Sequence, residues 1–214
     1  MTRFDECRYA FPERSSWPED DDVVAVGADL EPDTLLHAYA HGMFPMHIDR
    51  MRQQIGWWSP VRRGIIPLDG LRVTKSMRRS ARRFTVSMDT DFTAVMVACG
   101  DTRREGRWIT DDFVRSYSRL HTGGHAHSVE VRDPDGDLVG GLYGVRIDRF
   151  FAGESMFHLA TDASKVALMH LVGWMKDQGM TLLDTQWCTP HLASLGCVEI
   201  SRDEYLRRLA LAID

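Results

Sequence analysis

Residues 128–187, SVEVRDPDGDLVGGLYGVRIDRFFAGESMFHLATDASKVALMHLVGWMKDQGMTLLDTQW, decide the fold because they predict three consecutive strands, a long helix and a further strand. Ser128 to Arg132 alternates like a half-buried strand, and Pro134-Asp135-Gly136-Asp137 is a strong turn signal before the glycine-rich strand Leu138 to Val145. Phe150 to Phe157 predicts a third strand. We therefore expect an antiparallel meander.

The helix after the meander is expected to begin at Asp162, its N-terminal cap, and to end at Gly179. It is apolar on most sides, which predicts a largely buried helix. Met180 to Trp187 follows as another strand, and its apolar residues lead directly into Asp184. Three antiparallel strands, a buried helix and a further strand are the core order of acetyltransferase-like (GNAT-like) domains, so by analogy we expect an α+β fold of this kind.

The residues before the meander predict three more helices and a small separate domain. The helices are expected over Thr74 to Arg83, Asp89 to Cys99 and Thr110 to His121, the last with Thr110 as its cap. Further upstream, Glu31 to His41 has helical spacing and ends at Gly42, and Ser59-Pro60 disfavours helix. We expect a small N-terminal α/β domain over residues 1–60 and an acetyltransferase-like catalytic domain over residues 61–214.

The composition is that of a globular protein: 214 residues, 43% hydrophobic and 27% charged, with a net charge of −5. The negative charge excludes a wholly basic nucleic-acid-binding protein, so any contact with nucleic acid must be a local patch. The N-terminal residues lack a signal pattern and no apolar run reaches membrane-spanning length, so we expect a cytoplasmic protein without membrane contact. Four scattered cysteines (Cys7, Cys99, Cys188 and Cys197) indicate reduced thiols.

One local patch of positive charge is present. Five cations within nine residues recur at steps of three and four, so on a helix they share one face and can follow a nucleic-acid backbone. The alternative is a helix face that serves only solubility. The five residues are Lys75, Arg78, Arg79, Arg82 and Arg83.

Three polar residues in apolar strands are candidates for chemistry. Glu154 lies in Gly153-Glu154-Ser155-Met156-Phe157, where a buried carboxylate is costly without hydrogen-bond donors, so it is either structural or holds a substrate amine. Asp184 and Gln186 end a strand and, with a period of two, are expected on the same face. Together they could bind an amine, or they could be polar strand-end residues in water.

Two other kinds of site receive less support. His125 and His127 project from one side of an extended segment, but two ligands are too few for zinc, so we expect no metal. Coenzyme A binding usually needs Gln/Arg-x-x-Gly-x-Gly/Ala, and the two partial matches, at Gln53 and Arg103, place Trp58 and Trp108 where a small residue is required. We therefore expect an acyl donor other than coenzyme A.

The chain resembles the leucyl/phenylalanyl-tRNA-protein transferases over roughly residues 20–205. The resemblance lies in nine motifs that occur in the family order. They are Val26-Gly27-Ala28-Asp29-Leu30, Gly42-Met43-Phe44-Pro45, Trp57-Trp58-Ser59-Pro60, Trp108-Ile109-Thr110, Gly124-His125-Ala126-His127-Ser128-Val129-Glu130-Val131, Gly140-Gly141-Leu142-Tyr143-Gly144-Val145, Gly153-Glu154-Ser155-Met156-Phe157, Ala163-Ser164-Lys165 and His191-Leu192-Ala193-Ser194-Leu195-Gly196.

The resemblance implies an aminoacyltransferase that moves Leu, Phe or Met from an aminoacyl-tRNA to the N-terminus of proteins beginning with Arg or Lys, in the N-degron pathway, with no cofactor. In the family, the carboxylate matching Glu154 lies by the aminoacyl group, and the pair matching Asp184 and Gln186 lies where the acceptor amine attacks. We hypothesise that Asp184 orients Gln186 and attracts the amine, with Gln186 nearest the departing proton. An alternative proton route uses the tRNA ribose hydroxyl. We expect a monomer.

The resemblance also implies residues that bind the two ends of the substrate. Alignment with the family places Leu142, Leu168, Leu171 and Met175 in the aminoacyl pocket, an aliphatic lining where some relatives have phenylalanine. Trp108 is expected to stack on the terminal adenosine. Family members commonly have tryptophan where this chain has Met46, so the small domain is expected to contact the adenosine differently.

Three alternative functions remain at the level of sequence. The chain could transfer leucine to proteins that begin with Asp or Glu. It could bind tRNA without catalysis, although retention of Glu154, Asp184 and Gln186 disfavours this. It could also be a small-molecule acetyltransferase, which the missing pyrophosphate loop disfavours.

Overall fold

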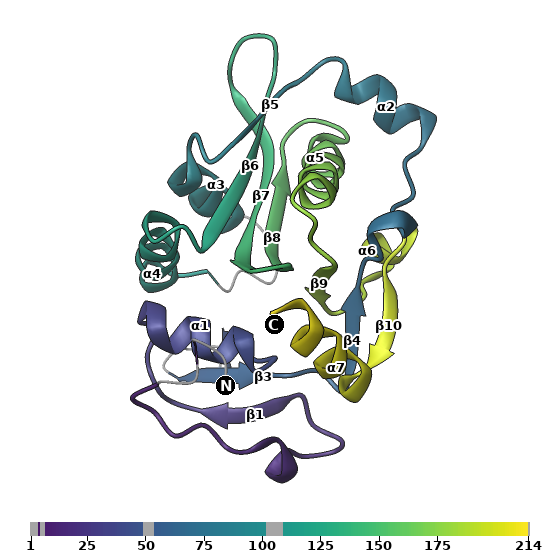
Figure 1. Cartoon of the computed structure of the whole chain (residues 1–214). Helices are drawn as coiled ribbons and strands as arrows, with labels where there is room; N and C mark the ends of the chain where they lie inside the picture. The colour runs from purple at the N-terminus through teal and green to yellow at the C-terminus, as the bar shows by residue number, and fades with distance from the viewer. Residues whose placement is uncertain (1–3, 5–6, 49–53, 102–108, 214) are drawn as a thin grey trace.

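The computed structural model describes residues 4, 7–48, 54–101 and 109–213, and the strands in this part of the chain form a small and a large sheet (Figure 1). Trp57 is fully buried in the small sheet, where its indole N–H donates to the Gly27 carbonyl at 2.8 Å. Helix α1 (Pro32–Ala40) connects β1 to β2, and Gly42 after it has a φ of 84°, the left-handed stop expected there. The small sheet is antiparallel in the order β1 (Val23–Val26), β3 (Ile55–Trp58), β2 (Phe44–His47).

The large sheet has the strand order β10-β4-β9-β8-β7-β6-β5 and contains the expected meander β6-β7-β8. Strand β9 pairs with β8 in parallel because helix α5 crosses between them; the other neighbouring strands pair antiparallel. The strands are β4 (Arg62–Ile65), β5 (Thr85–Met88), β6 (Ala126–Arg132), β7 (Leu138–Ile147), β8 (Phe150–His158), β9 (Leu182–Gln186) and β10 (Val198–Ser201).

Helices cover both faces of the meander. Helix α5 packs on the face to which Val129 and Leu142 belong, and α3 and α4 pack on the face of Tyr143. Gly140 in β7 permits the close approach of α5, since a Cβ there would lie 2.5 Å from the Cβ of Ala163. The helices are α2 (Lys75–Ala81), α3 (Phe92–Cys99), α4 (Asp111–Thr122), α5 (Ala163–Asp177), α6 (Pro190–Ser194) and α7 (Arg202–Ala212), with 3-10 turns at Arg14–Ser16 and Leu68–Gly70.

The expected α+β class is confirmed, and the acetyltransferase-like order of meander, buried helix and further strand is the order observed. Two details of capping differ from expectation. Thr110 and Asp162 occupy the N-cap positions of α4 and α5, but neither side chain makes a capping hydrogen bond. Asp162 instead has a φ of 68° and binds Lys165 and Ser80, so its carboxylate connects α5 to α2.

The two sheets are linked through α7, whose Arg202 donates to three backbone carbonyls. These belong to Pro18, Asp21 and Ser59, at distances of 2.6, 2.6 and 2.7 Å. The small sheet ends at Trp58 and the large one begins at Arg62. A domain boundary at residue 60 stays a prediction. Within the described ranges no helix is long and apolar enough to cross a membrane.

Candidate functional site

A cavity of about 400 Å³ opens where β8 and β9 run in parallel. Its wall is mainly apolar and comes from both sheets and from α5 and α6. Its polar lining residues include Glu154 and Gln186. The other lining residues are Phe44, Pro45, Met46, Leu142, Gly153, Ser155, Met156, Leu168, Leu171, Leu183, Thr185, Trp187, Thr189, His191 and Leu192.

Leu142, Leu168 and Leu171 of the expected aminoacyl pocket lie on this wall, and Met175 does not. Met175 is one helical turn beyond Leu171 and is fully buried in the core between α5 and the sheet, so it supports the wall from outside the cavity. Its placement in the pocket lining was wrong. Met46 and Met156 contribute flexible thioethers to this wall.

Gln186 and Glu154 are in direct contact on the cavity wall. The Gln186 Nε2 atom donates to Glu154 Oε1 at 3.1 Å, and Gln186 has a φ of 57°, a left-handed conformation that is uncommon for a residue with a side chain. This backbone conformation interrupts the alternation of β9. Gln186 therefore lines the cavity while Asp184 does not, and the expected common face was wrong.

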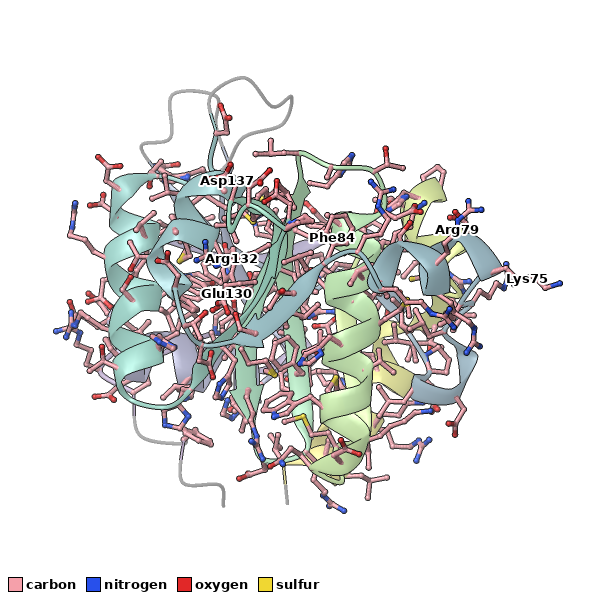
Figure 2. The ribbon with its side chains drawn as sticks, turned by 90° about the horizontal axis from the view of Figure 1, so that it is seen from above. Lys75, Arg79, Phe84, Glu130, Arg132 and Asp137 are labelled. Atoms are coloured by element: carbon pink, nitrogen blue, oxygen red, sulfur yellow. The ribbon has the colours of Figure 1, made fainter. Side chains whose placement is uncertain are left out.

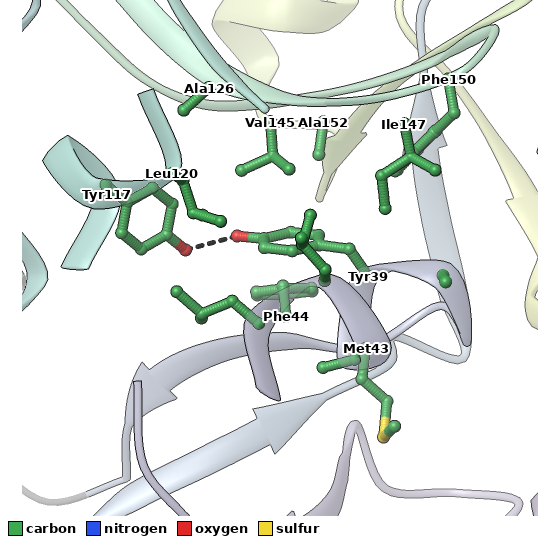
Figure 3. Packing of buried hydrophobic residues seen from close by; sticks show 14 of the residues in the cluster. Tyr39, Met43, Phe44, Tyr117, Leu120, Ala126, Val145, Ile147, Phe150 and Ala152 are labelled. Atoms are coloured by element: carbon green, nitrogen blue, oxygen red, sulfur yellow. Dashed lines mark hydrogen bonds between the residues drawn. The ribbon is translucent and has the colours of Figure 1, made fainter. Parts of the chain in front are cut away.

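Two buried tyrosines, Tyr39 of α1 and Tyr117 of α4, lie close enough to Glu154 to influence its pKa. The two hydroxyls also hydrogen-bond to each other (Figure 3). Burial raises the pKa of Glu154 to about 8; hydrogen bonds from the tyrosines and the Arg63 charge oppose this rise, and the Asp184 charge adds to it. The Glu154 carboxyl group therefore favours its protonated form more than an exposed glutamate does.

Asp184 lies behind Gln186 and is fully buried. Arg63 binds it in a bidentate pair, with Nε to Oδ1 at 2.8 Å and Nη2 to Oδ2 at 2.6 Å. The Tyr205 hydroxyl donates to Oδ2 at 3.0 Å, and the backbone N–H of Gln186 donates to Oδ1 at 2.9 Å. These four hydrogen bonds hold the Asp184 carboxylate in place and, through it, the backbone of Gln186.

Arg63 is the functional residue that the sequence analysis missed. It is fully buried, its guanidinium carbon lies 4.8 Å from the Phe44 ring centroid and 4.2 Å from that of Tyr205, and it donates to the Gly42 carbonyl at 3.2 Å. Burial alone would lower the pKa of Arg63, but the adjacent Asp184 raises it above its ordinary value. The sequence signal was an arginine directly before the apolar segment Gly64 to Ile66.

The predicted cationic face is exposed on α2 and just beyond it. Figure 2 shows Lys75 and Arg79 projecting outward from this helix. The helix ends at Ala81, so Arg82 is its C-cap and Arg83 follows it; these two arginines were wrongly placed inside the helix. Met77 and Ser80 of α2 are buried against the protein. Arg78 is exposed as well, and among the described residues none of the five cations forms an ion pair.

Several other sequence predictions can be placed. His127 Nδ1 lies 2.7 Å from Asp89 Oδ2, and no group of three metal-binding side chains occurs among the residues that the structure describes. Trp108, Gln53 and Arg103 lie outside the described residues. Adenosine stacking by Trp108 and the comparison with coenzyme A loops therefore stay predictions.

A parallel β8–β9 pair, an aliphatic cavity and a fixed amide–carboxylate pair define the class of protein: an acyl-transfer enzyme of the α+β type. The family model for the leucyl/phenylalanyl-tRNA protein transferase matches residues 65–210, and the model for its N-terminal domain matches residues 28–61. This chain belongs to that family.

Curated relatives with the name leucyl/phenylalanyl-tRNA-protein transferase support this membership. One from Cereibacter sphaeroides is 51% identical over 187 residues and covers 86% of each chain. One from Pseudoalteromonas atlantica is 47% identical over 195 residues and covers 89% of this chain and 82% of its own. Among solved structures, FemX aligns with a TM-score of 0.47 at 12% identity, and the alignment covers 83% of this chain and 70% of its own. A GCN5-related N-acetyltransferase from Kribbella flavida aligns with a TM-score of 0.38 at 12% identity, and that alignment covers 78% of this chain and 60% of its own.

Proposed function

We propose that this protein is an aminoacyltransferase that moves leucine, and also phenylalanine or methionine, from an aminoacyl-tRNA to proteins whose first residue is Arg or Lys. It would work as a monomer in the cytoplasm, without metal or cofactor, and mark its acceptors for degradation by the N-degron pathway. The observation that carries the proposal is a mainly apolar cavity whose wall includes the hydrogen-bonded pair Gln186 and Glu154.

The cavity suits the side chain of the donor amino acid. Leu142, Leu168 and Leu171 offer aliphatic contacts, and we propose that the ester carbonyl of the aminoacyl group lies near Glu154 and Gln186 on the same wall. The ester is already activated by its attachment to tRNA. The enzyme therefore has to align an uncharged amine with the carbonyl and stabilise the tetrahedral intermediate.

Gln186 is placed to receive the attacking amine. Because its Nε2 atom donates to Glu154, its amide oxygen is left to accept a hydrogen bond from the amine and to fix the direction of attack. Asp184 acts as a positioning residue, since it contacts Gln186 through the backbone N–H and does not line the cavity. This replaces the hypothesis that Asp184 attracts the amine itself.

Glu154 supports the preference for basic acceptors. A cationic Arg or Lys side chain would favour the ionised form of Glu154 and so recover part of the cost of burying that charge. An acidic acceptor side chain would face a carboxyl group that cannot ionise beside it. This favours Arg and Lys over the alternative acceptors that begin with Asp or Glu.

The exposed cations of α2 are proposed to contact the tRNA phosphates, since they carry a concentrated positive charge on an otherwise acidic protein. Trp108 is proposed to stack on the terminal adenosine, and Met46, on the cavity wall, to pack near it.

The test is to incubate labelled leucyl-tRNA with four peptides that differ only in their first residue: Arg, Lys, Asp or Glu. We expect leucine at the new N-terminus of the Arg and Lys peptides, detected by mass spectrometry. Gln186→Ala should reduce transfer at least tenfold, whereas the control Leu211→Ala, on the exposed surface, should not. Binding of tRNA without transfer, or leucine on the acidic peptides only, would overturn the proposal.

A further inference from the structure

Two cysteines border the cavity wall formed by α6. Cys188 follows Gln186 by two residues, and Cys197 lies just before β10. The residues between them include Thr189, His191 and Leu192, all of which line the cavity. A covalent bond between the two cysteines would therefore fix both ends of one wall of the site.

The fold brings these two thiols together across an intervening strand. Strand β4 separates β9 from β10, but Gly64 in β4 has no side chain, and a Cβ there would lie 2.7 Å from the Cys188 nitrogen and 2.9 Å from Thr185 Oγ1. Thr185 Oγ1 in turn lies 3.4 Å from Cys197 Sγ. The end of β9 thus folds over Gly64 to reach Cys197.

Cys188 and Cys197 pack on the same hydrophobic cluster beside α5, and the Cys188 thiol is close enough to influence the pKa of Cys197. Their environments differ. Cys197 is 6% exposed, and burial, together with the Cys188 thiol, raises its pKa to about 12 although Thr185 opposes the rise; Cys188 is half-buried. An oxidant from solvent therefore reaches Cys188 first, and Cys197 is protected until Cys188 has reacted.

We propose that Cys188 and Cys197 form a redox-active pair, which a hydroperoxide oxidises to an intramolecular disulfide that alters the cavity wall and lowers transfer. In the first step the Cys188 thiol and hydrogen peroxide give a sulfenic acid and water. In the second, Cys197 sulfur attacks the Cys188 sulfur, the S–S bond forms, and the hydroxyl leaves as water with the Cys197 proton. Two thiols are oxidised and one peroxide is reduced to two waters.

The consequence for the site follows from the length of the bond. The disulfide holds the sulfur atoms about 2.05 Å apart and so ties Cys188, and the chain that follows Gln186, to Cys197. The backbone of Gln186 has a left-handed conformation two residues before Cys188. The direction of its side-chain amide towards Glu154 is therefore sensitive to changes in the chain at Cys188. Transfer should fall at least fivefold, while affinity for tRNA, which is proposed to involve the exposed α2 cations, should change less than twofold. This effect on transfer rests on the proposed function.

The pair is tested directly on the whole protein. After exposure to hydrogen peroxide, remaining thiols are blocked with N-ethylmaleimide and the protein is digested with trypsin under non-reducing conditions. Residues 177–202 contain no internal Lys or Arg and include both cysteines, so the disulfide should appear as a peptide two hydrogens lighter than the reduced one and without maleimide. Cys188→Ala and Cys197→Ser should each abolish this species, and the control Cys99→Ala should retain it.

Activity gives the second measurement. The oxidised protein should regain transfer on treatment with dithiothreitol, and Cys188→Ala and Cys197→Ser should resist peroxide doses that inhibit the wild type and Cys99→Ala. The proposal would be overturned if the lighter peptide did not form, or if peroxide inhibited Cys188→Ala and Cys197→Ser as strongly as the wild type. If the reduced wild type transfers no amino acid, the proposed function fails, whereas the peptide masses still decide whether the disulfide forms.

Discussion

Replacing Arg63 by Met should remove much of the stability of the protein. The Arg63 and Asp184 side chains are 1% and 0% exposed, and the change leaves a buried carboxylate with donors only from Tyr205 and the Gln186 backbone. Removing one partner of such a buried pair costs about 3–5 kcal/mol, because the remaining charge is uncompensated. The free energy of unfolding, measured by urea denaturation at pH 7, should fall by that amount.

The neighbouring residue supplies a matched control. Arg62 forms an ion pair with Glu199 at 3.7 Å, and these side chains are 64% and 44% exposed, so Arg62→Met should cost less than about 1 kcal/mol. The double variant Arg63→Met/Asp184→Asn removes the uncompensated charge and should recover at least about 2 kcal/mol relative to Arg63→Met. Equal destabilisation by Arg62→Met and Arg63→Met, or no recovery in the double variant, would refute the reasoning.

Three further changes test other parts of the site. Because the pKa of Glu154 is raised to about 8, the contribution of Glu154 to stability is fully present below its unfolded pKa of about 4.5 and is lost as the pH rises through about 8. Glu154→Gln should therefore make the urea midpoint depend less on pH between pH 5 and 9. The same pH dependence in wild type and variant would contradict this. Arg78→Ala/Arg79→Ala should weaken tRNA binding and reduce the slope of log K against log salt by about 1–2, whereas an unchanged slope would exclude phosphate contacts there. Leu171→Ala should lower kcat/KM for leucyl-tRNA by about tenfold or more with less effect on phenylalanyl-tRNA, and equal losses for both donors would count against the cavity as the donor pocket.

The sequence predicts the meander and the buried helix well because their signals are local. Alternating residues, the Asp135-Gly136 turn and the Gly179 stop each determine structure within a few residues. Strands β4 and β10 have no comparable signal, since each has four residues and is stabilised by partners far along the chain. Helix α7 was not predicted either, although Ser201 caps it by accepting from the Glu204 N–H.

The candidate site was predictable in its composition and less so in its geometry. The residues Glu154 and Gln186 could be selected as polar groups in apolar strands, and the structure brings them within 3.1 Å. Strand periodicity placed Asp184 beside Gln186 on one face, and it failed because the left-handed backbone of Gln186 breaks the alternation. The arginine before the apolar segment Gly64 to Ile66 was a weak signal for Arg63, and its partner, 121 residues away, could not be identified from the sequence.

The contacts of Arg202 have a consequence for synthesis on the ribosome. This side chain donates to carbonyls of Pro18, Asp21 and Ser59, 184, 181 and 143 residues earlier in the chain. A nascent chain therefore exposes these carbonyls to solvent until α7 has emerged from the exit tunnel, and contacts of such long range slow the last stage of folding. A translation product that stops before α7 would lack both Arg202 and Tyr205, so premature termination should give chains that chaperones and proteases recognise as unfinished.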